Sequence, residues 1–124
     1  MISDGAKNVM IWILSIILFG AFAIAGVSKL LGVEEQVNDI ASWDYPTWSI
    51  YPIGIIEILL ALGYLVPRMR IWTVRATYIW ALVAFITHWQ ADQLHLVWGS
   101  IIFSLLAFVV GTIHRSKSNL EANI

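Results

Sequence analysis

The chain has 124 residues, of which 60% are hydrophobic and 12% are charged, with a net charge of −1. A soluble domain carries about twice that charged fraction, so the composition excludes an ordinary soluble protein and indicates an integral membrane protein. The near-zero net charge and the lack of a long basic patch exclude a nucleic-acid partner. The absence of cysteine excludes disulfides, thiol redox chemistry and c-type haem attachment, so any redox chemistry needs a bound cofactor.

The first predicted membrane span covers residues 9–32. It begins like a secretory signal and contains an Ala-x-Ala pattern, but its apolar run is longer than a signal core, so we expect a retained helix. Ala21, Ala25 and Lys29 follow one another at four-residue spacing and share one helix face. Lys29 lies near the end of the span, where a lysine either extends its charge to the membrane surface or pairs within the membrane.

Residues 33–49 form the longest connection between the predicted spans. Its first half places apolar residues at helical spacing and acidic or amide residues opposite them, which predicts a short amphipathic helix at the membrane interface. Trp43, Tyr45 and Trp48 follow. We interpret them as interfacial anchors, and a lid that faces a ligand is the alternative.

The second predicted span, residues 50–67, contains one ionisable residue that interrupts the apolar pattern, Glu57. A charge at the centre of a membrane helix costs about 2.5–3.5 kcal/mol on insertion scales, so this carboxyl group must be neutral, paired or hydrated. Gly54 precedes it by three residues and Ala61 follows it by four. The three residues therefore share a helix face that another helix can approach closely.

Two further spans are predicted over residues 71–90 and 94–113, and the polar residues 114–124 predict no further element. The third span has one moderately polar face, formed by Thr73, Thr77, Trp80, Ala84 and either Thr87 or His88. The fourth span has a stripe of small residues suited to helix packing, formed by Ser100, Ser104, Ala107 and Gly111.

These patterns predict an all-α membrane protein: a single domain of four transmembrane helices, with a short interfacial helix in the first outer loop. The basic residues gather at the N-terminus, in the second loop and at the C-terminus, which lie on one side of a four-span bundle. They are Lys7, Arg68, Arg70, Arg75, Arg115 and Lys117. The positive-inside rule then predicts cytoplasmic termini, in a bacterial inner (plasma) membrane.

In this orientation the interior polar groups converge on the outer half of the bundle. Three interpretations of Lys29 and Glu57 are open: a structural ion pair, a functional site, or two independent roles. In a functional site Glu57 exchanges a proton or holds a polar head group, and Lys29 sets its charge.

His88 and His95 lie seven residues apart, with Asp92 between them as the one candidate for a third metal ligand. A two-histidine metal or haem site requires facing helix surfaces and further ligands. Both histidines instead lie beside tryptophans at the expected interface, so we predict no metal site. The sequence also contains no nucleophile motif, phosphate-binding glycine loop or dinucleotide fingerprint.

The segment FAIAGVSKL at residues 22–30, followed by Gly-Ile-Ile-Glu at residues 54–57, resembles the DoxX-like family. In that family a first helix ends in Gly-x-x-Lys and a second carries a glutamate after a glycine. The matching residues here are Gly26, Lys29, Gly54 and Glu57. The resemblance covers nearly the whole chain and implies a bundle of four transmembrane helices. It also implies a link to redox processes, because the family name comes from subunits of a thiosulfate- or quinol-linked oxidoreductase, whereas animal relatives resemble receptor-assembly chaperones of the endoplasmic reticulum.

Our hypothesis from the sequence is that the chain binds a quinone or similar lipophilic molecule at an outward-facing polar site. It would serve as the membrane subunit of a redox process, completed by a membrane or periplasmic partner. Lys29 and Glu57 would contact the polar head, with Trp48 and His95 as further cofactor-binding candidates. His88 would relay protons to the outer surface.

The alternative is a non-catalytic accessory or assembly protein that packs its small-residue stripes against partner helices in the bilayer, as a monomer or a homo-oligomer. A small transporter is a weaker option, because one protomer has no broken helix or inverted repeat and would need an oligomer. An isomerase or hydrolase acting on a lipophilic substrate is also open, because an acid and a base in a dry pocket suffice.

Overall fold

The computed structural model describes residues 3–122, and every regular element in this range is helical. The long helices are α1 (Asp4–Leu30), α3 (Ile50–Leu65), α4 (Arg70–Gln90) and α5 (Val97–Ala122), and the short one is α2 (Glu34–Ser42). Single 3-10 turns precede the last three long helices: η1 (Thr47–Ser49), η2 (Pro67–Met69) and η3 (Leu94–Leu96). With these turns, the four long helices are long and apolar enough to cross a membrane. The predicted four-span all-α fold, with a short helix in the first loop, is confirmed.

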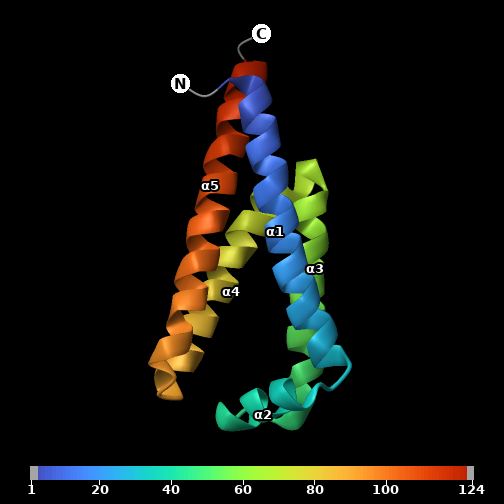
Figure 1. Ribbon diagram of the computed structural model, residues 1–124, viewed down its shortest axis with the longest axis vertical. Helices are drawn as coiled ribbons and strands as arrows, with labels where there is room; N and C mark the ends of the chain where they lie inside the picture. The colour runs from blue at the N-terminus through green and yellow to red at the C-terminus, as the bar shows by residue number, and fades with distance from the viewer. Residues whose placement is uncertain (1–2, 123–124) are drawn as a thin grey trace.

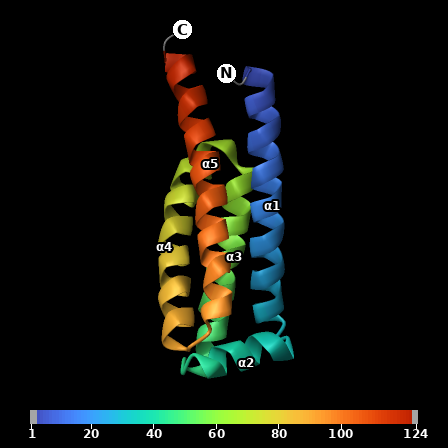
Figure 2. The ribbon, with the colours of Figure 1, turned by 60° about the vertical axis from the view of Figure 1, so that its left-hand side comes forward.

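The long helices associate as two pairs, α1 with α3 and α4 with α5 (Figure 1). The pairs converge toward the end where both termini lie, and α2 runs across the opposite end, nearly perpendicular to the long helices (Figure 2). The chain turns from α1 into α2 at Gly32, whose φ of +67° is the left-handed conformation that commonly ends a helix. This turn directs α2 away from the axis of α1 and over the end of the bundle.

The closest backbone approach joins α1 to α3 at Gly26 and Gly54. A Cβ atom at Gly26 would lie 2.7 Å from the carbonyl oxygen of Gly54, and one at Gly54 would lie 3.0 Å from that of Gly26. Neither position has room for a side chain. Small residues of this kind allow membrane helices to gain van der Waals contact where no hydrophobic effect drives them together.

One aromatic residue from each long helix fills the centre of the bundle: Phe22, Tyr64, Trp80 and Phe103. The Phe22 ring lies with its centroid 5.0 Å from those of both Trp80 and Phe103, and 6.3 Å from that of Tyr64. Such ring contacts contribute about 0.5–1.5 kcal/mol each beyond their buried area. They hold the two helix pairs together where the backbones diverge.

The first residue of α4 is a buried basic residue that the sequence places in a loop. Arg70 is only 2% exposed, and its Nε donates to the backbone carbonyl of Tyr64, 3.1 Å away, in the last turn of α3. Its guanidinium group lies 4.1 Å from the Trp12 ring centroid. An unpaired carbonyl and a neighbouring ring therefore draw the arginine inward from the positively charged second loop.

The last turns of α5 are helical to Ala122, although residues 114–124 predict no element. They lie beside the first turns of α1, where Lys7 donates to the Ser116 hydroxyl at 2.7 Å and Lys117 donates to the Asn8 side chain. These contacts between distant segments extend the helix beyond the apolar run. The final residues 123–124 of the predicted tail lie outside the described range.

We expect Gly26→Ala to lower the free energy of unfolding by about 1–3 kcal/mol relative to Gly20→Ala, because the new methyl group overlaps the Gly54 carbonyl. Both changes bring the same gain in helix propensity, and a Cβ at Gly20 has nothing within 4 Å. Reversible unfolding in mixed micelles measures the difference. Equal stability of the two variants would contradict the close α1–α3 contact.

Candidate functional site

Lys29 and Glu57 form an ion pair between α1 and α3. The Lys29 Nζ lies 3.0 Å from Oε1 and 3.2 Å from Oε2 of Glu57, so the ammonium group contacts both carboxylate oxygens. The residues are 6% and 2% exposed. Because they are in direct contact, the interpretation that gives them independent roles is wrong, and a structural pair and a functional site remain.

The contact between Gly26 and Gly54 explains why the charged residues meet. Lys29 follows Gly26 by one helical turn, Glu57 follows Gly54 by one turn, and α1 and α3 run antiparallel. The two Cα atoms therefore lie on opposite sides of the glycine contact along the helix axis. Helical side chains point back toward the N-terminus of their own helix, so the two side chains extend toward each other. The glycines leave the space in which they meet.

The ion pair borders the aromatic centre of the bundle. The Trp80 side chain makes a further, weaker polar contact with the Glu57 carboxyl group. The same indole packs edge-on against Phe22 and Phe103, with centroids 5.0 and 5.5 Å apart. The carboxyl group therefore has a cation on one side and the edge of an aromatic cluster on the other.

A second polar network, the Gln93 network, lies where α2 crosses the end of the bundle opposite the termini, and its centre is Gln93 in the turn before η3. The Gln93 Oε1 accepts from the Trp43 indole N–H at 2.9 Å and contacts the His88 Nδ1 at 3.0 Å. The Gln93 Nε2 donates to the Ser42 hydroxyl at 3.2 Å. With the amide in this orientation, the His88 Nδ1 carries a hydrogen and donates it.

A neighbouring hydrogen bond fastens the same segment to α4. The Tyr45 hydroxyl lies 2.5 Å from the Thr87 hydroxyl, which is buried in the last turn of the helix. The Trp43 ring also packs edge-on against the His88 imidazole, with centroids 5.4 Å apart. The segment after α2 is therefore held against α4 and the α4–α5 turn.

The structure brings together two of the five candidate site residues. His88 belongs to the Gln93 network, and within residues 3–122 no hydrogen bond joins it to Lys29 or Glu57. Trp48, in η1, is 68% exposed, which agrees with an interfacial anchor and places it away from the pair. His95, in η3, is also exposed. Within the described residues, no three His, Asp or Glu side chains converge as a metal centre requires.

Several residues around the pair and in the Gln93 network were not among the candidates, and the central ones are Trp80 and Gln93. Trp80 lies on the polar face predicted for the third span, and this face is the signal that could have identified it. Gln93 gave no such signal, because its partners Trp43 and Ser42 are separated from it by a whole helical hairpin.

The energetic role of the ion pair can be separated from its chemical role. We expect Lys29→Met alone to lower the free energy of unfolding by about 3 kcal/mol, because it leaves the buried Glu57 carboxylate without a counter-charge. The double variant Lys29→Met with Glu57→Leu should regain most of this loss, because apolar pairs of similar volume replace buried ion pairs at little cost.

Unfolding in mixed micelles measures both, with Arg115→Met, an exposed basic residue of α5, as the control. A double variant as unstable as the single one would make the pair a structural requirement.

A comparison of the sequence with family profiles matches residues 13–110 to the DoxX-like family. The comparisons with curated proteins and with solved structures found no match. The matched range contains α2, α3, α4 and most of α1, and both members of the ion pair. With its four candidate spans, the chain is therefore a multi-pass membrane protein that belongs to the DoxX-like family.

Proposed function

We propose that this protein binds a lipophilic molecule of the quinone class, with its polar head at the Lys29–Glu57 pair. The observation that carries the proposal is the burial of both charges inside the bundle, at 6% and 2% exposure. Burying an ion pair between membrane helices adds little net stability over apolar side chains. Ionisable residues within membrane spans are rare and mark ligand or proton sites, so a chemical role accounts for the pair best.

The surroundings of the pair suit a quinone ring. The ammonium group of Lys29 can donate to a ring carbonyl, and Glu57 can give or accept the proton that accompanies its reduction. Trp80, which packs against Phe22, supplies an aromatic surface next to the carboxyl group. Reduction of a quinone to a quinol takes up two electrons and two protons. In this proposal a membrane or periplasmic redox partner supplies the electrons. The Gln93 network, which contains His88, exchanges protons with the outer surface.

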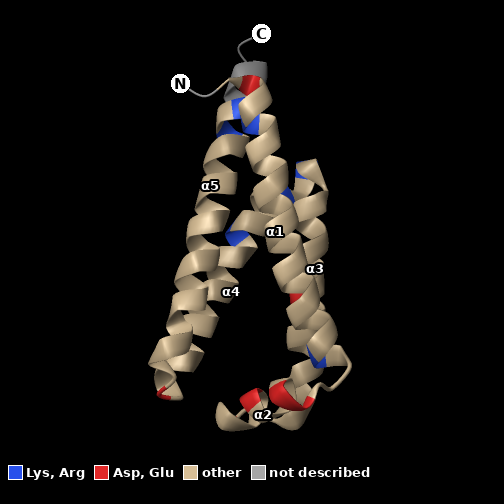
Figure 3. Ribbon diagram, viewed as in Figure 1, with Lys and Arg blue, Asp and Glu red and all other residues tan. Residues whose placement is uncertain are grey.

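The proposed orientation places both termini in the cytoplasm of a bacterial cell and α2 on the outer face of the inner membrane. Basic residues gather near the termini, while acidic residues gather on and around α2 (Figure 3). This asymmetry supports the assignment through the positive-inside rule.

The orientation can be tested with single cysteines, because the chain contains none. We expect Ala41→Cys, on the exposed face of α2, to react in intact cells with a reagent that does not cross the membrane. Gly5→Cys, near the start of α1, should react only after the cells are opened. The opposite pattern would invert the orientation and move the pair to the inner half of the membrane.

The ligand proposal is tested on protein purified gently from its native membrane, first by mass spectrometry of extracted small molecules. In nanodiscs, we expect decyl-ubiquinone to bind and Glu57→Gln to weaken it about tenfold, since a hydrogen bond to a charged group contributes about 1.5–3 kcal/mol. Glu35→Gln, the same change on the exposed surface of α2, is the matched control.

An extract of ordinary phospholipid together with unchanged binding in Glu57→Gln would refute the ligand site. It would leave Lys29 and Glu57 as a structural pair.

The accessory-protein alternative loses its main support in this fold. The small-residue stripe on α5 packs within the protein: Ala107 and Gly111 are buried, and a Cβ at Gly111 would lie 3.2 Å from the Val74 side chain of α4. Ser100 is buried as well. Ala107 and Gly111 hold α5 against α4, so only the part of the stripe around Ser104 stays open to a partner helix.

A further inference from the structure

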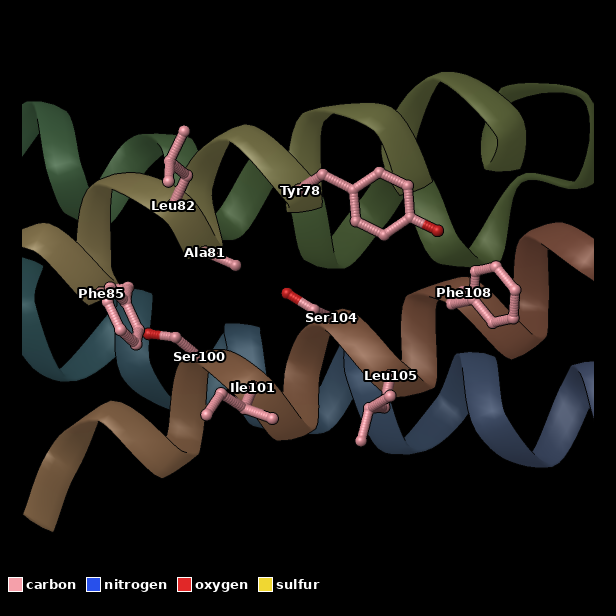
Figure 4. Close-up of a pocket in the computed structure, with 9 residues that line it drawn as sticks. All are labelled: Tyr78, Ala81, Leu82, Phe85, Ser100, Ile101, Ser104, Leu105 and Phe108. Carbon is pink, nitrogen blue, oxygen red and sulfur yellow. The ribbon is translucent and has the colours of Figure 1, made fainter.

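The lipid-facing surface between α4 and α5 contains a groove with a volume of about 460 Å³. Apolar and aromatic side chains form most of its walls, and three hydroxyl-bearing residues also line it (Figure 4). These are Tyr78, Ser100 and Ser104. A hollow of this size lies within the range of small-molecule sites, about 300–1,000 Å³.

Two serine hydroxyls of α5 point into the groove without a partner. Ser100 is only 5% exposed, Ser104 is half-buried, and both oxygens face the space between the helices in Figure 4. Within residues 3–122 neither hydroxyl makes a hydrogen bond. The helix threonines differ, because Thr77 and Thr112 each donate to the carbonyl oxygen one turn earlier. The serine donors therefore remain available to an occupant of the groove.

The membrane around the groove offers nothing to satisfy these donors. Hydrocarbon contains no water, and an unpaired polar group there costs free energy until it finds an acceptor. Acyl chains carry no acceptor along their length. The exposed side chains that surround the serines on these two helices, such as Ile79, Leu82 and Ile102, are aliphatic and have no acceptor either. The occupant that fits is a small lipophilic molecule with its own acceptor.

We propose that the α4–α5 groove binds a lipophilic carbonyl compound whose conjugated or aromatic ring lies between Phe85 and Phe108. Ser100 and Ser104, one helical turn and about 6 Å apart along α5, donate to its carbonyl oxygen atoms. The rings of Phe85 and Phe108 lie toward the two ends of the groove. This site uses α4 and α5, whereas the Lys29–Glu57 pair lies on α1 and α3, so it does not rest on the function proposed above.

The probe for this site is an alkyl-tailed benzophenone, whose ketone both accepts hydrogen bonds and reacts with nearby C–H bonds under light. In phosphatidylcholine nanodiscs we expect saturable labelling of α4 and α5 residues in the groove, located by peptide mass spectrometry. The double variant Ser100→Ala with Ser104→Ala should raise the half-saturating concentration about tenfold, because two hydrogen bonds are lost. Thr112→Ala, on the same helix outside the groove, should leave it unchanged.

A second variant tests the space itself. Ser104→Phe fills the groove and should abolish the saturable labelling, with the fold checked by reversible unfolding. Glu57→Gln should leave the labelling unchanged, which distinguishes a failure here from a failure of the ion-pair site.

Labelling that never saturates and spreads over all lipid-facing residues would refute the proposal. So would efficient disulfide formation between two copies of Leu105→Cys, because it would place a second chain over the groove.

Discussion

Two charges can be buried in this bundle only if they face each other, and the Gly26–Gly54 contact makes that geometry available. The contact brings the α1 and α3 backbones to van der Waals distance. The antiparallel direction of the helices then aims the two side chains at a common point. Since a lone charge in a membrane interior is expensive, the glycines and the charged residues form one unit. The α1–α3 packing and the candidate site therefore depend on the same few atoms.

The fold is largely predictable from the sequence, because it follows from patterns repeated within each helix. The length of the apolar runs predicts the four membrane spans, and the amphipathic spacing of residues 34–42 predicts α2. The contact between Lys29 and Glu57 does not follow from the sequence alone. The spacing places each beside a glycine, but only the packing of α1 on α3 decides between contact and independence.

The remaining features depend on contacts that no local pattern encodes. The sequence places Arg70 in the basic loop between the second and third spans. In the structure, a free carbonyl group at the end of α3 and the Trp12 ring hold its side chain inside the bundle. Trp48 and His95 lie at helix starts, where the periodicity of the sequence does not decide whether a side chain faces the bundle or the surface. Both side chains are exposed in the structure. Gln93 contacts Trp43 and Ser42, which lie 50 and 51 positions away in the sequence, so its role appears only in three dimensions.

The position of α2 has a mechanical consequence. The chain joins α2 directly to α1 and α3, and the Gln93 and Thr87 hydrogen bonds join the residues after it to the other helix pair. It thus ties the two pairs together at the end where their backbones diverge most (Figure 1). Two of the three hydrogen bonds on the Gln93 amide, those with Trp43 and Ser42, cross between the helix pairs. The separation of the two pairs at this end is therefore set by a few side chains: Gln93 with these two partners, and Tyr45 with Thr87.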